Sequence, residues 1–330
     1  MQFPHWWLKR NLISWLLWPC SRLFALIVLV RRFFYRIHLF PTYTSPLPII
    51  IVGNINVGGT GKTPLVIALA NQLKKEGKQP AILSRGYRSV SKTFPLAVTV
   101  DTPVILAGDE PLMMAQQTGC LVVIDPHRVR GVKYLEQSKQ CDVIICDDGL
   151  QHYALGRALE ILVVDGQRGF GNGFLLPAGM LREPISRAQT VDMVVCNGDT
   201  SSDLPRNAFT MKLTVGAIRL LSDPTQTLSI EDFMGKATHA VAGIGHPERF
   251  FNLLRRYGLE VIPHPFPDHH QFTPKDFDFL SDENTPILMT EKDAVKCMDM
   301  FCKKTNVWYM QVTAQLSDSF YEKINDILAK

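Results

Sequence analysis

The sequence lacks the cysteine patterns that typify metal-binding and secreted proteins. Its seven cysteines are odd in number and scattered, and no two of them form a CxxC pair. Disulfide frameworks and structural zinc sites both depend on regular cysteine spacings. The sequence also contains no internal repeat and no low-complexity tract. We therefore expect reduced cysteines and a globular body in the cytoplasm.

Acidic residues are missing from the first 40 positions, which hold six of the 35 lysines and arginines. The whole chain carries a formal net charge of +4, so the remaining residues have a slight acidic excess. Because only this segment has an excess of basic over acidic residues, we expect no nucleic-acid partner. A length of 330 residues, 46% of them hydrophobic, is enough for two domains or one large α/β unit.

The N-terminal segment 1–40 is apolar and contains four of the five tryptophans. A cleaved signal peptide is not expected, because Arg31 and Arg32 directly follow the apolar run 23–30 and no small-residue cleavage site is present. A transmembrane helix over 11–30 would have the required length of about 20 residues. However, Pro19 and Arg22 lie near its middle, and a central arginine costs about 2.5–3.5 kcal/mol on insertion.

We favour instead a helix that lies in the membrane interface, which would make the protein peripheral or monotopic. On a helical projection Arg22, Arg32 and Arg36 share one side and the large apolar residues point elsewhere, although Arg31 breaks the pattern. Tryptophan favours the headgroup boundary, and cations are attracted to anionic lipid. The segment therefore predicts a membrane surface with anionic lipid as a partner.

The stretch 49–63, IIIVGNINVGGTGKT, predicts a phosphate-binding loop. A buried strand over 49–52 precedes a glycine-rich loop, and a helix follows from about Pro64. Backbone N–H groups of such a loop converge on phosphates, Lys62 reaches the β- and γ-phosphates, and the Thr63 hydroxyl holds Mg²⁺. Asn56 stands where the usual pattern has glycine, and asparagine tolerates a positive φ. The expected ATP-binding residues are Asn56, Val57, Gly58, Gly59, Thr60, Gly61, Lys62 and Thr63.

Short apolar runs alternate with helical stretches through the body, which predicts a mostly parallel sheet with helices on both faces. Strands are expected at 81–83, 121–124, 142–146, 160–164 and 192–196, an extended stretch at 96–106, and helices after 108 and over 129–138. A smaller α/β unit follows, with strands near 238–244, 286–290 and 307–312 and helices at 247–257 and 318–328. We divide the chain into an N-terminal segment 1–40, a P-loop core 41–210, a β linker 211–236 and a C-terminal lobe 237–330.

Polar residues that could carry chemistry follow the expected strands, where ligands bind in open α/β sheets. Asp147 and Asp148 end a strand beside the phosphate loop and predict Mg²⁺ ligands, with a simple turn as the alternative. Asp109 in GDEP is a candidate general base, but this motif is equally typical of a helix N-cap. The glycine-rich stretch 166–184 reads as a functional loop.

The loop 264–274, HPFPDHHQFTP, contains two adjacent histidines. His269 or His270 could act as a base or a phosphate contact, a zinc cluster with His264 is conceivable, and a solvated loop is the plain alternative. Three arginines in expected loops could each bind a phosphate through two hydrogen bonds, or could be exposed surface charges. They are Arg85, Arg128 and Arg182.

The basic N-terminus and the motifs NVGGTGKTP, LSRGYR, GDEP, DPHR, DDGLQH, LPAGMLREP, FPDHHQF and TEKDAVK together resemble the tetraacyldisaccharide 4′-kinase (lipid A 4′-kinase) family. The resemblance implies a two-lobed, P-loop NTPase-like kinase that uses ATP. It implies transfer of phosphate to the 4′-hydroxyl of a tetraacylated glucosamine disaccharide 1-phosphate, in lipid A biosynthesis. It also implies the cytoplasmic face of a Gram-negative inner membrane, and we expect a monomer.

Residue by residue, the resemblance implies that Asp109 and His269 activate the acceptor hydroxyl, with His270 as the alternative. It implies that Asp147 and Asp148 are the Mg²⁺-site carboxylates. The other matched positions that line the family's active site are Arg128, Arg182 and Glu183.

Two other functions remain open on the residues alone. A membrane-associated regulatory ATPase would carry a lysine before the glycine pair, where this chain has Val57. A GTPase or metallochaperone would need a guanine motif, for which 290–293, TEKD, is a candidate. Nucleotide choice distinguishes these functions from an ATP-dependent lipid kinase.

Overall fold

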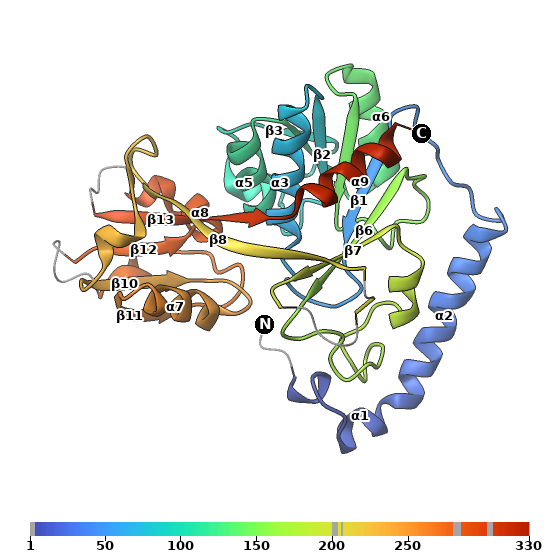
Figure 1. Ribbon diagram of the computed structural model, residues 1–330, viewed down its shortest axis with the longest axis horizontal. Coiled ribbons are helices and arrows are strands. Elements are labelled where there is room, and N and C mark those ends of the chain that lie inside the picture. The colour runs from blue at the N-terminus through green and yellow to red at the C-terminus, as the bar shows by residue number, and fades with distance from the viewer. Residues whose placement is uncertain (1–3, 200–203, 206, 280–284, 302–305, 330) are drawn as a thin grey trace.

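The computed structural model describes residues 4–199, 204–205, 207–279, 285–301 and 306–329. Figure 1 shows two lobes side by side, with a long N-terminal helix along the outer edge of the first lobe. Within the described residues, one sheet of thirteen strands extends through both lobes, in the order β11-β10-β12-β13-β8-β7-β6-β1-β5-β2-β4-β3, with β9 paired to β8.

The first lobe is built on a parallel sheet. Its strands are β1 (Ile49–Gly53), β2 (Pro80–Ser84), β3 (Leu96–Val98), β4 (Leu121–Ile124), β5 (Val143–Asp147), β6 (Leu159–Asp165) and β7 (Met193–Asn197). All pair in parallel except β3, which is antiparallel to β4. The central strands are buried along their whole length, as is typical of a parallel sheet covered on both faces.

Helices cover the two faces of this sheet. One face carries α3 (Lys62–Lys75) and α5 (Asp109–Thr118), and the other carries α6 (Arg128–Ser138) and the short helix η2 (Ile185–Gln189). The predicted strand at 121–124 and the helix over 129–138 are thus confirmed within a residue. The extended stretch expected over 96–106 is wrong beyond Val98, because Pro103 precedes a helical turn, α4 (Val104–Ala107).

The second lobe continues the sheet. It contains β8 (Phe209–Leu220), β9 (Thr227–Leu228), β10 (Ala237–Ala242), β11 (Glu260–Pro265), β12 (Ile287–Thr290) and β13 (Val307–Gln315). Its helices are η3 (Ile230–Phe233), α7 (Pro247–Arg256), η4 (Pro274–Phe277) and α8 (Glu291–Phe301). Strand β8 begins parallel to β7 and continues antiparallel to β13, so these two long strands join the lobes (Figure 1).

Two segments differ from the expected division of the chain. Ile230 and Phe233, expected in the linker, pack into the core of the second lobe. The last helix, α9 (Asp318–Leu328), was expected in the C-terminal lobe, but Phe320 and Ile324 lie in the core of the first lobe. Strand β13 ends beside the first lobe, and the amphipathic helix that follows covers the nearest apolar face (Figure 1).

The N-terminal segment consists of η1 (His5–Trp7), α1 (Leu12–Leu16) and α2 (Trp18–Arg36). No helix among the described residues is long and apolar enough to cross a membrane. Helix α2 is attached to the body through Ser21, whose hydroxyl donates to the Leu175 carbonyl at 2.5 Å and accepts from the Ala178 N–H at 3.1 Å. Arg31 donates to the Gln151 carbonyl at 3.2 Å, which explains why this arginine departs from the predicted polar side.

Candidate active site

The phosphate loop connects β1 to α3 at the carboxyl edge of the sheet. Gly61 caps α3 with a φ of +92°, a conformation that glycine adopts without strain. A Cβ at this position would collide with the Asn197 side chain, so no residue larger than glycine fits at position 61. The Asn54 side chain donates to the Gly58 carbonyl at 3.1 Å and to the Thr60 hydroxyl at 3.3 Å. These hydrogen bonds preorganise the loop, so that its backbone N–H groups can bind an anion.

The glycine-rich stretch 166–184 supports the other side of this loop. The Val57 N–H donates to the Met180 carbonyl at 2.8 Å, and the Asn56 side chain donates to the Gly169 carbonyl at 2.7 Å. Arg168 donates to the Gly59 carbonyl. Asn56 is buried and faces this stretch, so its side chain replaces the usual glycine by anchoring the loop.

Asp147 and Asp148 lie at the end of β5 in different electrostatic environments. Asp148 has a φ of +50° and sits 3.4 Å from the Lys62 ammonium and 3.3 Å from the Arg182 guanidinium. Burial opposes ionisation of Asp148, but these two cations lower its pKa overall. Burial, followed by the charge of Glu110, raises the pKa of Asp147 to about 7. The Asp147 Oδ1 atom is buried without a hydrogen-bond partner, which suits a cation ligand.

The remaining predicted contacts fall into two groups. Arg182 reaches the site through Asp148, and Arg85 is exposed just beyond β2. Arg128 is buried and donates to the main-chain carbonyls of Asp125 and Asp147 at 3.0 and 2.7 Å. Arg128 thus ties together the ends of β4 and β5.

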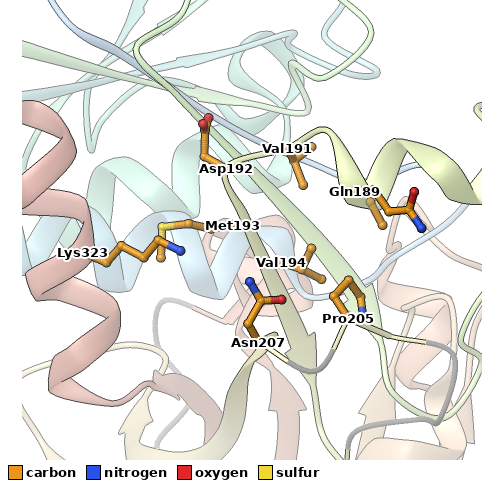
Figure 2. Close-up of a pocket in the computed structure, with 9 residues that line it drawn as sticks. Gln189, Val191, Asp192, Met193, Val194, Pro205, Asn207 and Lys323 are labelled. Carbon is orange, nitrogen blue, oxygen red and sulfur yellow. The ribbon is translucent and has the colours of Figure 1, made fainter.

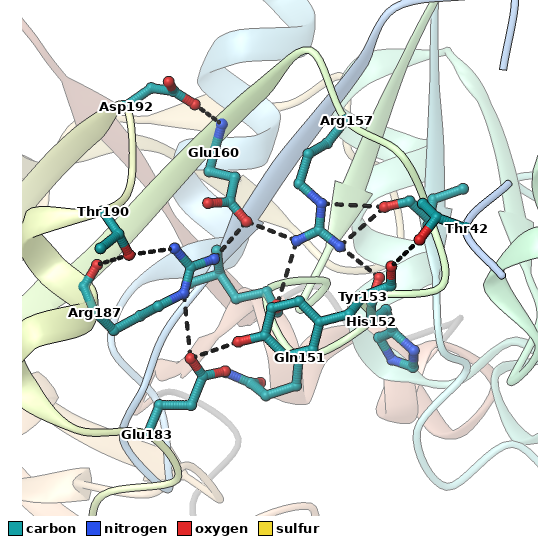
Figure 3. Close-up of polar contacts among 12 residues, drawn as sticks. Thr42, Gln151, His152, Tyr153, Arg157, Glu160, Glu183, Arg187, Thr190 and Asp192 are labelled. Carbon is teal, nitrogen blue, oxygen red and sulfur yellow. Dashed lines mark hydrogen bonds and ion pairs between the residues drawn. The ribbon is translucent and has the colours of Figure 1, made fainter. Parts of the chain in front are cut away.

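Glu183 is also buried, and Figure 3 shows it inside a polar network. It accepts hydrogen bonds from Gln151 at 3.0 Å and Tyr153 at 2.8 Å, and it pairs with Arg187 at 3.2 Å. Gln151 also donates to the Asn54 carbonyl at 3.0 Å. The network continues to Glu160, which Arg157 and Arg187 both contact (Figure 3). Glu183 is therefore connected, through Gln151, to Asn54 at the start of the phosphate loop.

Asp109 and His269 meet across the two lobes. The His269 Nδ1 atom lies 2.7 Å from Asp109 Oδ2, although the residues are 160 positions apart. Gly108 rather than Asp109 is the N-cap of α5, which leaves the Asp109 side chain available for this contact. Burial opposes ionisation of Asp109, but the hydrogen bond from His269 and the charge of Lys292 lower its pKa overall. Asp109 is therefore a buried carboxylate that stays ionised.

His270 points elsewhere. Its ring stacks on Phe266 at 4.8 Å between centroids, and its Nε2 atom lies 3.1 Å from Asp276. His264 contacts His239 at 2.9 Å, and the described residues contain no group of three or more metal-binding side chains. The structure thus brings His269, and not its neighbour, to Asp109.

The candidate guanine motif 290–293 is used inside the protein. Asp293 is fully buried and accepts from the Gly243 N–H at 2.8 Å, and Glu291 accepts from Gln311 at 2.8 Å. Lys292 reaches the Asp109–His269 pair, with its Nζ atom 3.1 Å from His269 Nε2. Lys292 thus joins the two lobes, Asp293 is bonded within the second lobe, and these side chains are not available to a nucleotide base.

A second link between the lobes was not predicted. Arg249 at the start of α7 forms a two-pronged ion pair with Asp165, at 2.8 and 2.9 Å. Asp165 is fully buried at the end of β6 and also accepts from Arg168, which holds the phosphate loop. Asp165 had a sequence signal as a polar residue at a strand end, whereas Arg249 had none.

A cavity of about 250 Å³ lies on the opposite edge of the sheet. Figure 2 shows Met193, at the start of β7, beside Lys323 of α9, and Asp192 and Val194 also line the cavity. The phosphate loop lies at the carboxyl ends of the strands, so this cavity is separate from the candidate active site.

Known proteins resemble this chain along nearly its whole length. The family model described as tetraacyldisaccharide-1-P 4′-kinase matches residues 13–329. A tetraacyldisaccharide 4′-kinase of Nitrosococcus oceani is 45% identical over 98% of this chain and 93% of its own length. One of Pasteurella multocida is 46% identical over 100% of this chain and 98% of its own. A crystal structure of LpxK from Aquifex aeolicus in complex with ATP has a TM-score of 0.81 and 30% identity, covering 96% and 100% of the two chains.

Proposed function

The chain belongs to the tetraacyldisaccharide-1-P 4′-kinase family, and from this premise we propose how its residues carry out the reaction. The protein is a lipid A biosynthesis kinase that transfers phosphate from ATP to the 4′-hydroxyl of a tetraacylated glucosamine disaccharide 1-phosphate. Phosphoryl transfer depends mainly on positioning and on charge neutralisation. The observation that carries our proposal is the Asp109–His269 contact between the two lobes.

ATP binds through the loop 56–63 in this proposal. The loop N–H groups and the N-terminus of α3 receive the phosphates, and Lys62 moves from Asp148 to the β- and γ-phosphates. Thr63, Asp147 and Asp148 fit Mg²⁺, because they offer only hard oxygen ligands and Asp147 Oδ1 has no other partner. A bound Mg²⁺ would neutralise charge on the phosphates.

Asp109 accepts the proton of the attacking hydroxyl in this proposal. Glu110, the next residue, is close enough to Asp147 for its charge to raise the pKa of Asp147, which supports a place for the Asp109–His269 pair near the phosphate site. A buried, ionised carboxylate in that place can accept a proton as the new bond to phosphorus forms. Because His269 comes from the second lobe, the pair is complete only when the lobes are together.

The membrane-facing surface is formed by α1 and α2. Large apolar side chains of these helices are exposed: Leu12, Ile13, Leu16, Leu23, Leu26, Ile27, Leu29, Val30 and Phe33. Exposed apolar surface of this extent marks an interaction site, and the exposed Arg22 and Arg36 would attract anionic lipid. A lipid substrate with four acyl chains requires such a surface. We place the protein, as a peripheral monomer, on the cytoplasmic face of the bacterial inner membrane.

A phosphotransfer assay with labelled ATP and the lipid disaccharide 1-phosphate in detergent micelles tests the proposal. We expect label in the lipid with ATP as donor, and a fall in kcat of about 10²–10⁴ for His269→Ala, the range for losing acid–base catalysis. His270→Ala is the matched control and should stay near wild type. Equal activity of both variants, or tight GDP binding with no lipid product, would contradict the proposal.

A further inference from the structure

We propose that Lys292 is a positioning residue that fixes His269 in the tautomer with the proton on Nδ1, so that His269 always donates to Asp109. This inference rests on the proposed function. It gives a role to the motif TEKDAVK, which lies in the second lobe. Among the described residues, this motif makes no contact with the phosphate loop.

The Lys292 ammonium lies among four groups of the lobe interface. Its Nζ atom is 3.1 Å from His269 Nε2 and 2.9 Å from Glu110 Oε1. It is also 3.5 Å from an Asp268 oxygen and 4.0 Å from Asp109 Oδ2. Burial opposes the charge on Lys292, but Glu110 and Asp109 raise its pKa overall. Lys292 is therefore a fixed cation in contact with the catalytic pair.

The donor and acceptor roles follow from the chemistry of the three groups. An ammonium has three donors and no acceptor, so His269 Nε2 can only accept from Lys292. A neutral imidazole that accepts at Nε2 carries its proton on Nδ1. The 2.7 Å contact is then an N–H donated by His269 to the Asp109 carboxylate. Lys292 at Nε2 and the acceptor-only Asp109 carboxylate at Nδ1 thus both favour the tautomer with the proton on Nδ1.

The backbone of His269 is also fixed by hydrogen bonds. Its φ of +58° is strained for a residue with a side chain, and its N–H donates to the Gly243 carbonyl at 3.1 Å. Arg88 donates to the His269 carbonyl at 3.1 Å, and the Tyr87 ring meets the imidazole edge at 5.5 Å. With backbone and ring both fixed, rotation of the imidazole would break several contacts.

The position of Lys292 also affects when the pair takes up protons. The charged and titratable groups around the imidazole are Asp109 and Glu110 on α5, Asp268 in its own loop, Tyr87 and Arg88 after β2, and Lys292 on α8. The charge of Lys292 contributes to the lowered pKa of Asp109, because a nearby cation disfavours the protonated carboxyl group. Removal of Lys292 should therefore let Asp109 bind a proton at higher pH.

Nitrogen NMR of the histidine rings tests the tautomer without any need for turnover. The full-length enzyme is labelled with ¹⁵N-histidine in detergent, and the His269 signal is assigned by its loss in His269→Gln. We expect a protonated Nδ1 and an unprotonated Nε2 in the wild type. In Lys292→Met, Asp109 should take up a proton at higher pH and then donate to Nδ1, so that Nε2 carries the proton from a higher pH than in the wild type. An unprotonated Nε2 in both proteins, or a protonated Nε2 in the wild type, would overturn the proposal.

The pH profile of kcat/KM for the lipid provides the second test. In Lys292→Met the acid limb should move to higher pH by about one unit or more, the usual effect of a nearby charge. Lys292→Arg keeps the charge and should restore most of the wild-type limb. Gln117→Ala, which removes an α5–α8 hydrogen bond to Glu291 away from His269, is the matched control and should leave the limb in place.

The outcomes separate this inference from the proposed function. If Lys292→Met and Gln117→Ala both keep the wild-type acid limb, the lysine only joins the lobes and the inference fails. If Lys292→Met does not fold, Lys292→Gln and Lys292→Arg are read in the same way. Full activity of Asp109→Asn would instead refute the proposed base, whatever tautomer His269 adopts.

Discussion

The exposed apolar face of α2 provides a direct test of membrane docking. Leu26, Ile27 and Val30 are 54%, 58% and 40% exposed, and we would change all three to serine. Complete burial of such a side chain stabilises by about 1.5–3 kcal/mol, and roughly half of each is free to enter a membrane. The three together should therefore contribute about 2–4 kcal/mol, which corresponds to a roughly 30- to 700-fold change in membrane partition.

Co-sedimentation with vesicles that contain anionic lipid measures this partition. The matched control changes Val90, Val100 and Ile105 to serine, because these first-lobe residues are 55%, 56% and 54% exposed but lie outside the N-terminal segment. Both triple variants should fold, since neither alters a buried residue. Equal vesicle binding of the α2 variant and the control would refute the assignment of this face to the membrane.

Two further predictions concern the fold and the phosphate loop. Burial raises the pKa of Glu291 from 4.5 to about 7, so the folded protein loses stability as the pH rises through this range and Glu291 ionises. Glu291→Gln should therefore increase the free energy of unfolding by up to about 3 kcal/mol at pH 8 and leave it unchanged at pH 4. Thermal unfolding at the two pH values measures this, and no gain at pH 8 would contradict the burial argument. Gly61→Ala should weaken ATP binding by roughly 5- to 150-fold through strain of about 1–3 kcal/mol and contact with Asn197, as calorimetry can measure. Gly77→Ala, which has a similar positive φ but open space around it, is the control and should not affect ATP binding.

Local patterns allowed much of the first lobe to be predicted. The phosphate loop, the strands around it and α6 depend on residues close together in sequence, so glycine spacing and apolar runs identify them. The segment after Val98 was harder, because a short helix of apolar residues resembles a strand. The destination of α9 could not be predicted, because an amphipathic helix packs on whichever apolar face the preceding strand brings near.

Contacts between distant residues decide the site, and spacing cannot predict them. Asp109 was equally compatible with a helix cap until His269 was found beside it. Lys292 lies in a stretch that was one candidate for a guanine motif, and its contacts with Glu110 and Asp109 come from the other lobe. Arg128 was a candidate phosphate contact, and the structure adds that it donates to main-chain carbonyls at the ends of β4 and β5, a role that spacing does not reveal.

In the proposed mechanism Asp109 accepts the proton of the lipid hydroxyl, and the phosphate loop binds ATP independently of Asp109. The decisive experiment is single-turnover transfer of labelled phosphate from saturating ATP to the lipid disaccharide 1-phosphate, measured for the wild type and Asp109→Asn. We expect the rate in Asp109→Asn to be lower by about 10²–10⁴ and the Kd for ATP to be unchanged. A wild-type rate would contradict it, and a large loss of ATP affinity would assign Asp109 to the nucleotide site instead.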